Sequence, residues 1–186
     1  MALVWYLDRA SALLAYSALY LAVVSGVFFN ACGFGTLHAL ARRYHVLISV
    51  FATILLLIHG AVGVADSALL VGGFAPAPTY PMWYFVAGAA VGGGALLLLL
   101  VAVLGFVDAR RFSRPWSPRV VHAFAYGGYV FATAHMLAVG SDVGATVRLG
   151  AIAGVAFLAY ALLLRLLVET GVLQWDSSPA SKSTGE

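Results

Sequence analysis

His45–His59 reads HVLISVFATILLLIH, and His122–His135 reads HAFAYGGYVFATAH. Each stretch has a histidine at both ends of a largely apolar run that is suited to a membrane helix. An ionisable side chain inside a bilayer costs several kcal/mol unless it has a partner. Four histidines in two matched stretches therefore need one shared explanation, and they decide how the rest of the chain is interpreted.

The composition is that of an integral membrane protein. The chain has 186 residues, of which 63% are hydrophobic and only 9% are charged, and its mean hydropathy is +0.99. These values lie well outside the range of soluble domains. Since one transmembrane helix takes about 20 residues, five spans account for most of the chain. No room is left for a nucleotide-binding module.

Five apolar runs are long enough to cross a bilayer. They cover residues 11–31, 45–66, 82–107, 118–139 and 145–168. The sequence thus predicts an all-α membrane protein, a five-helix transmembrane bundle, in one domain over residues 1–170. The polar segment 171–186 is expected to be a short disordered tail.

Basic residues set the expected orientation, because short loops rich in Lys and Arg stay in the cytoplasm. Seven of the ten basic residues fall on one side: Arg42, Arg43, Arg110, Arg111, Arg114, Arg119 and Lys182. We therefore expect the N-terminus outside and the C-terminus inside, in a prokaryotic cytoplasmic membrane. Topology and contact with membrane lipid account for the net charge of +3, so no nucleic-acid partner is predicted.

With this topology the histidines fall at two depths. His45 and His122 lie at the inner ends of their runs, and His59 and His135 come fourteen and thirteen residues later, about 20 Å further along a helix. Each level receives one histidine from each run. Two imidazoles fill both axial positions of a haem iron, which then transfers electrons. Axial ligation of two b-type haems is the interpretation we favour.

Helical geometry agrees with this interpretation only in part. Fourteen residues return to within about 40° of the same helix face, whereas thirteen leave an offset of about 140°. The fourth run is therefore expected to bend or change its winding near Gly127 and Gly128. His38 lies off the two-level pattern, in an expected inner loop, and is left out of the ligand set.

Two alternatives use the same histidines without haem. A cofactor-free proton-relay, transport or scaffold subunit would need intramembrane carboxylates or broken helices, and no acidic residue lies in mid-span. Metal transport would need ligands that share one ion, but the two levels are about 20 Å apart. The glycines Gly92–Gly94 suit close packing of helices or of a cofactor, since no strand or Lys-Ser/Thr pair makes them a phosphate loop.

Local sequence around the histidines resembles a known superfamily. Leu7–Ser11 (LDRAS), Arg119–His122 (RVVH) and Gly140–Asp142 (GSD) after His135 are similar to segments of the ferric reductase-like transmembrane domain superfamily. It includes ferric reductases, NADPH oxidases and the haem subunit of the bacterial methionine sulfoxide reductase system. The resemblance extends over about residues 5–168. That superfamily usually has six helices, and the first has no counterpart here.

The resemblance implies an oxidoreductase component that holds two haem b groups. Its haem ligands would be His45 with His122 on the inner side and His59 with His135 on the outer side. Electrons would pass from a cytoplasmic flavoprotein or a membrane quinone to ferric iron, oxygen or a partner enzyme outside. No flavin or NAD(P) motif is present on this chain. Arg43, Arg119 and Arg9 are the main candidates to pair with haem propionates at the interfaces, followed by Arg42 and Arg148.

Overall fold

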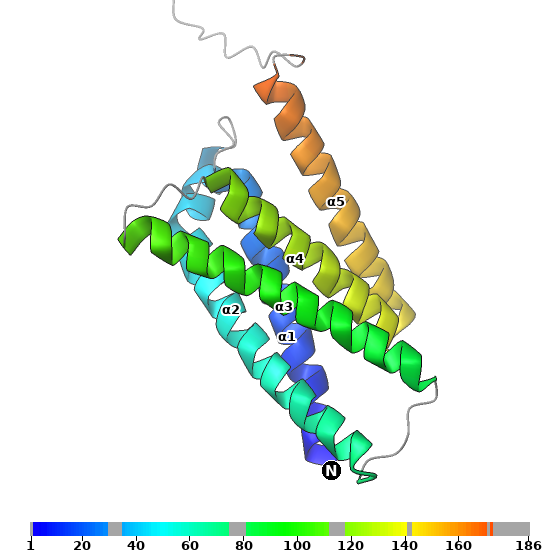
Figure 1. Cartoon of the computed structure of the whole chain (residues 1–186). Helices are drawn as coiled ribbons and strands as arrows, with labels where there is room; N and C mark the ends of the chain where they lie inside the picture. The colour runs from blue at the N-terminus through cyan, green and yellow to red at the C-terminus, as the bar shows by residue number, and fades with distance from the viewer. Residues whose placement is uncertain are drawn as a thin grey trace, which may run out of the picture.

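The computed structural model describes residues 2–29, 35–74, 81–111, 118–140, 143–170 and 172. These residues form five α-helices and no strand (Figure 1). The helices are α1 (Ala2–Phe29), α2 (Gly35–Val71), α3 (Met82–Arg111), α4 (Pro118–Val139) and α5 (Ala145–Glu169). The all-α prediction is confirmed for this part of the chain. The predicted tail, 171–186, lies outside the described residues except for Val172.

Four of the helices are long and apolar enough to cross a membrane. Their candidate spans are Leu3–Phe28, Arg43–Val71, Met82–Asp108 and Ala145–Val168, as in a multi-pass membrane protein. The remaining helix, α4, is not among them, because its histidines, tyrosines and glycines lower its mean hydropathy. That all five helices cross the bilayer stays a prediction.

Two helices begin earlier than the apolar runs indicated. The first begins at Ala2 and not near residue 11. Asp8 therefore lies inside this helix, where it is buried and paired with Arg9. The second begins at Gly35, so the expected loop around His38 and Arg43 is wrong, and these residues belong to the first turns of α2. A charged residue therefore does not mark the beginning of either helix.

The bundle is built from two helix pairs. Extensive contacts join α1 to α2 and α3 to α4, whereas contacts between these two pairs are sparse. Figure 1 shows α5 diverging from the other four helices toward its C-terminal end, and its contacts are with α1 and α4. Side chains of α1 such as Ala15, Ala18, Leu19 and Ala22 make up much of the buried core. Small residues on α1 let α2 approach closely.

Large apolar side chains cover the outside of the bundle. On α2, Leu47, Phe51, Ile54 and Leu57 are between 46% and 66% exposed. An apolar surface of this extent is expected where lipid, and not water, surrounds a protein.

Candidate functional site

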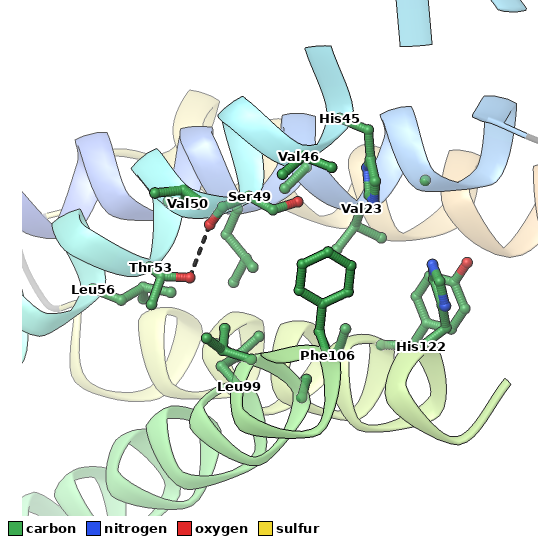
Figure 2. A pocket seen from close by; sticks show the side chains of 18 of the residues that line it. Val23, His45, Val46, Ser49, Val50, Thr53, Leu56, Leu99, Phe106 and His122 are labelled. Atoms are coloured by element: carbon green, nitrogen blue, oxygen red, sulfur yellow. Dashed lines mark hydrogen bonds between the residues drawn. The ribbon is translucent and has the colours of Figure 1, made fainter. Parts of the chain in front are cut away.

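The inner histidine pair joins α2 to α4. The ring centroids of His45 and His122 are 6.2 Å apart, and their planes differ by only 12°. Figure 2 shows the two rings reaching from opposite helices into one cavity, where Val23 and Leu99 also contribute to the lining. The structure thus brings together the two residues that topology had assigned to the inner level.

The outer pair joins the same two helices again, fourteen residues further along α2 and thirteen residues further along α4. The ring centroids of His59 and His135 are 6.3 Å apart, and the ring planes differ by 56°. Each level therefore has one histidine from α2 and one from α4 at almost the same separation. The pairs run between helices, as the sequence analysis expected.

The separation of the rings suits two ligands on opposite sides of one metal ion. A metal–imidazole bond is about 2 Å long, so two axial imidazoles place their ring centroids about 6 Å apart. No group of three or more His, Cys, Asp or Glu side chains that could hold a metal ion is found in the described ranges. Each level instead offers two imidazoles, the number that a six-coordinate haem iron takes from its protein.

The inner pair lies in an apolar cavity of about 290 Å³. This volume is close to the lower end of cofactor pockets, which begin at about 300 Å³. Side chains from α1, α2, α3 and α4 line it, and most of them are apolar. Such walls suit the faces of a porphyrin, and the cavity lies where the two helix pairs make few contacts. The residues present therefore fit a haem with His45 and His122 as axial ligands.

A serine of α1 orients the His45 ring. Ser25 Oγ lies 3.0 Å from His45 Nδ1 and donates its own proton to the Ala22 carbonyl at 2.8 Å. Because a hydroxyl has one proton to donate, Ser25 Oγ must accept from His45 Nδ1–H. That tautomer leaves the lone pair on Nε2, the nitrogen available for a metal.

A backbone carbonyl orients the His135 ring in the same way. His135 Nδ1 lies 2.7 Å from the carbonyl oxygen of Gly88 on α3. A carbonyl only accepts, so Nδ1 carries the proton and Nε2 the lone pair. The ring lies against Gly92, where a Cβ would be 2.7 Å from Nδ1. In the glycine run of α3, Gly92 therefore makes room for the histidine, whereas a Cβ at Gly93 would have nothing within 4 Å.

Two side chains of α1 approach His59. Ser11 Oγ lies 3.5 Å from His59 Nδ1 and donates to the Asp8 carbonyl, and Asp8 Oδ1 lies 3.3 Å from the same Nδ1. Both oxygens are acceptors for an Nδ1–H group, so His59 too keeps its lone pair on Nε2. Ligand histidines in metalloproteins are commonly held by such a second group.

Sequence reasoning missed these orienting residues. Asp8 was expected to lie before the first helix, and no role was predicted for Ser25 or Gly26. A Cβ at Gly26 would lie 3.0 Å from His45 Cε1. Gly26 therefore makes room for the His45 ring, as Gly92 makes room for the His135 ring. One feature of the sequence could have indicated the serines: Ser11 and Ser25 are fourteen residues apart on α1, the same spacing as His45 and His59, which they contact.

The expected change of winding in α4 is not found. The helix is one continuous α-helix from Pro118 to Val139, and both of its histidines still reach α2. Gly128 is explained by packing and not by a change of winding, because a Cβ there would lie 2.6 Å from Leu99 Cγ on α3. It permits close packing of α3 on α4.

The arginine candidates differ in their surroundings. Arg9 contacts Asp8 at 2.5 Å, lies 3.9 Å from Asp66 and stacks over the Trp5 ring. Arg43 is exposed, with its guanidinium over the Tyr44 ring. The backbone of Arg119 lies in α4, and its side chain is outside the described part of the structure, as is that of Arg42.

The last outer candidate, Arg148, stabilises a helix end. Its guanidinium donates to the backbone carbonyls of Val143 and Gly140, at the junction of α4 and α5.

A buried hydroxyl cluster lies between the two histidine levels. Tyr16 of α1 is 3.1 Å from Tyr129 and 3.0 Å from Thr133, both on α4, measured between hydroxyl oxygens. Tyr129 is fully buried. These bonds join α1 to α4 between the positions of His122 and His135.

Comparison with known proteins gives one match. A family model described as Domain of unknown function (DUF8596) matches residues 3–142. This region contains the described parts of α1 to α4 after Ala2, all four paired histidines, Asp8 and Ser25, whereas α5 lies beyond it. No curated protein and no solved structure matches the chain.

Proposed function

The chain belongs to the family described as Domain of unknown function (DUF8596), and we propose that it carries electrons across a membrane through two b-type haems. One observation supports this most directly: two histidine pairs on the same two helices have ring centroids 6.2 and 6.3 Å apart. Two helices with unrelated, half-buried histidines have no reason to reproduce one separation at two depths.

In this proposal the protein's own residues hold and orient the ligands. His45 with His122 would bind the inner haem, and His59 with His135 the outer haem. Nδ1 partners hold the rings of His45 and His135 before any ligand binds, which lowers the entropic cost of binding. Apolar side chains around the inner pair exclude water. A haem iron with two imidazole ligands supplies one-electron transfer and has no open position for substrate.

The ends of the electron path are proposed from charge and topology. All five helices would cross the bilayer, with the N-terminus outside and the C-terminus inside, in a prokaryotic cytoplasmic membrane. A cytoplasmic flavoprotein or a membrane quinone would donate electrons, and ferric iron, oxygen or a partner enzyme would accept them outside. Arg43 and Arg119 on the inner side and Arg9 on the outer side are the proposed propionate partners.

One contact favours a second candidate function. Asp8 lies inside a candidate span, beside His59, and a carboxylate with a histidine is a combination found in proton relays. A cofactor-free relay or transport subunit would use this pair without haem. Haem content therefore separates the two functions.

The test is a set of single substitutions read by haem content. His45→Ala and His122→Ala should each remove the inner haem, and His59→Ala and His135→Ala the outer haem, leaving about half of the wild-type haem by pyridine haemochrome assay. His38→Ala is the matched control and should keep both haems. Loss of all haem from every one of the four variants would contradict two independent levels, and unchanged haem content in all of them would remove the proposed ligands.

A further inference from the structure

The two histidine levels differ in the charge of the group that orients their α2 histidine. At the inner level the partner of His45 is the neutral hydroxyl of Ser25. At the outer level a serine hydroxyl, Ser11 Oγ, also lies near His59 Nδ1, at 3.5 Å, and the carboxylate of Asp8 is added to it, with Oδ1 at 3.3 Å from the same nitrogen. Asp8 is the only acidic side chain among the buried residues described.

The surroundings of Asp8 leave one carboxylate oxygen directed to the histidine. Arg9 contacts Oδ2. Oδ1 is buried and has no hydrogen bond within the described residues, although His59 Nδ1 is within ion-pair distance. An unsatisfied buried oxygen is costly, and an Nδ1–H group that turns toward it would relieve that cost. The outer site is therefore arranged for a carboxylate–histidine–metal chain.

We propose that Asp8 is a positioning residue that sets the reduction potential of the outer haem through His59. This inference rests on the proposed function. A negative acceptor on Nδ1–H makes the imidazole a stronger electron donor at Nε2. Stronger donation stabilises the ferric over the ferrous iron, so the potential falls. The other outer ligand, His135, has a neutral carbonyl as its Nδ1 partner, so the carboxylate is in direct contact with His59 only among the two outer histidines.

A redox titration of the purified protein tests this assignment. Dithionite supplies the electrons and ferricyanide removes them, and the component absent from His59→Ala is assigned to the outer haem. Asp8→Asn keeps nearly the same shape and removes the negative charge. At a fixed ambient potential, Asp8→Asn should raise the ratio of reduced to oxidised outer haem about tenfold. This change corresponds to a rise of about 59 mV in the reduction potential of the outer haem, for one electron. The inner component should stay unchanged.

Two further variants separate charge at His59 from charge nearby and from folding. Asp66→Asn removes another carboxylate near Arg9, 3.9 Å from its guanidinium. In this variant the ratio of reduced to oxidised outer haem should change much less than in Asp8→Asn. Asp8→Glu restores the carboxylate and should return the outer ratio toward wild type. If Asp8→Asn loses the outer haem, Asp8 is needed to hold that haem and not to set its potential, and the assignment is overturned.

The outcomes distinguish this inference from the function on which it depends. A wild-type protein that binds two haems, with an outer ratio unchanged by Asp8→Asn, overturns the role of Asp8 and leaves electron transfer in place. A wild-type protein without haem overturns both.

Discussion

Glycine stands where a histidine ring lies against a neighbouring helix. Gly26 of α1 lies under His45, and Gly92 of α3 lies under His135. The histidines and their pairing across helices could be predicted, because depth in a membrane follows from hydropathy and loop charge. Their Nδ1 partners could not, because α1 is apolar on all sides and its pattern does not say which face meets α2.

Substitution of two adjacent glycines tests whether close packing against α3 confines the His135 ring. Gly92→Ala places a methyl group 2.7 Å from His135 Nδ1, whereas a Cβ at Gly93 has nothing within 4 Å. Both changes favour the helix by the same amount, about 1 kcal/mol. Gly92→Ala should therefore lose most of the outer haem by pyridine haemochrome assay while Gly93→Ala keeps it. Equal haem content in the two variants would show that the ring is not confined there.

Individual helices were easier to predict than their ends and their rotation. The fourth apolar run and α4 have the same bounds, because Pro118 begins the helix and Gly140 follows its last residue. The starts of α1 and α2 were missed because charged residues were read as boundaries. A thirteen-residue interval does not require a change of winding in α4, since an ideal-helix projection ignores the reach of histidine side chains and the crossing of helices.

The hydroxyl cluster predicts how strongly α1 is held to α4. Tyr16→Phe removes the common partner of Tyr129 and Thr133, and Tyr129 is fully buried. We expect a loss of about 1–2 kcal/mol in the free energy of unfolding, measured by reversible unfolding in mixed micelles. Tyr6→Phe is the control, because Tyr6 is 64% exposed. A Tyr16→Phe protein as stable as the control would show that the cluster adds nothing to the packing.

At the scale of the whole molecule, the sparse contacts between the pairs α1–α2 and α3–α4 are the notable feature. Both histidine pairs bridge this division, since each joins α2 to α4. Composition predicted a helical membrane protein, but the pairing of helices depends on packing that hydropathy does not encode. A haem at each level would connect the two pairs, and a ligand that binds only the folded state stabilises it.

Orientation is also tested on the whole molecule. A protease-sensitive tag at the N-terminus should be cleaved in intact spheroplasts, and one at the C-terminus only in inside-out vesicles. The reason is the excess of arginine between the first two and between the third and fourth apolar runs. The reverse cleavage pattern would exchange the inner and outer levels.

Haem stoichiometry tests the central claim most directly. The wild-type protein, expressed with ample haem and purified from membranes, should contain two haem b per chain by pyridine haemochrome assay, with a reduced-minus-oxidised spectrum typical of low-spin iron. Two are expected because the structure has two histidine pairs with nearly the same separation between ring centroids. A protein that folds and contains no haem would contradict the account.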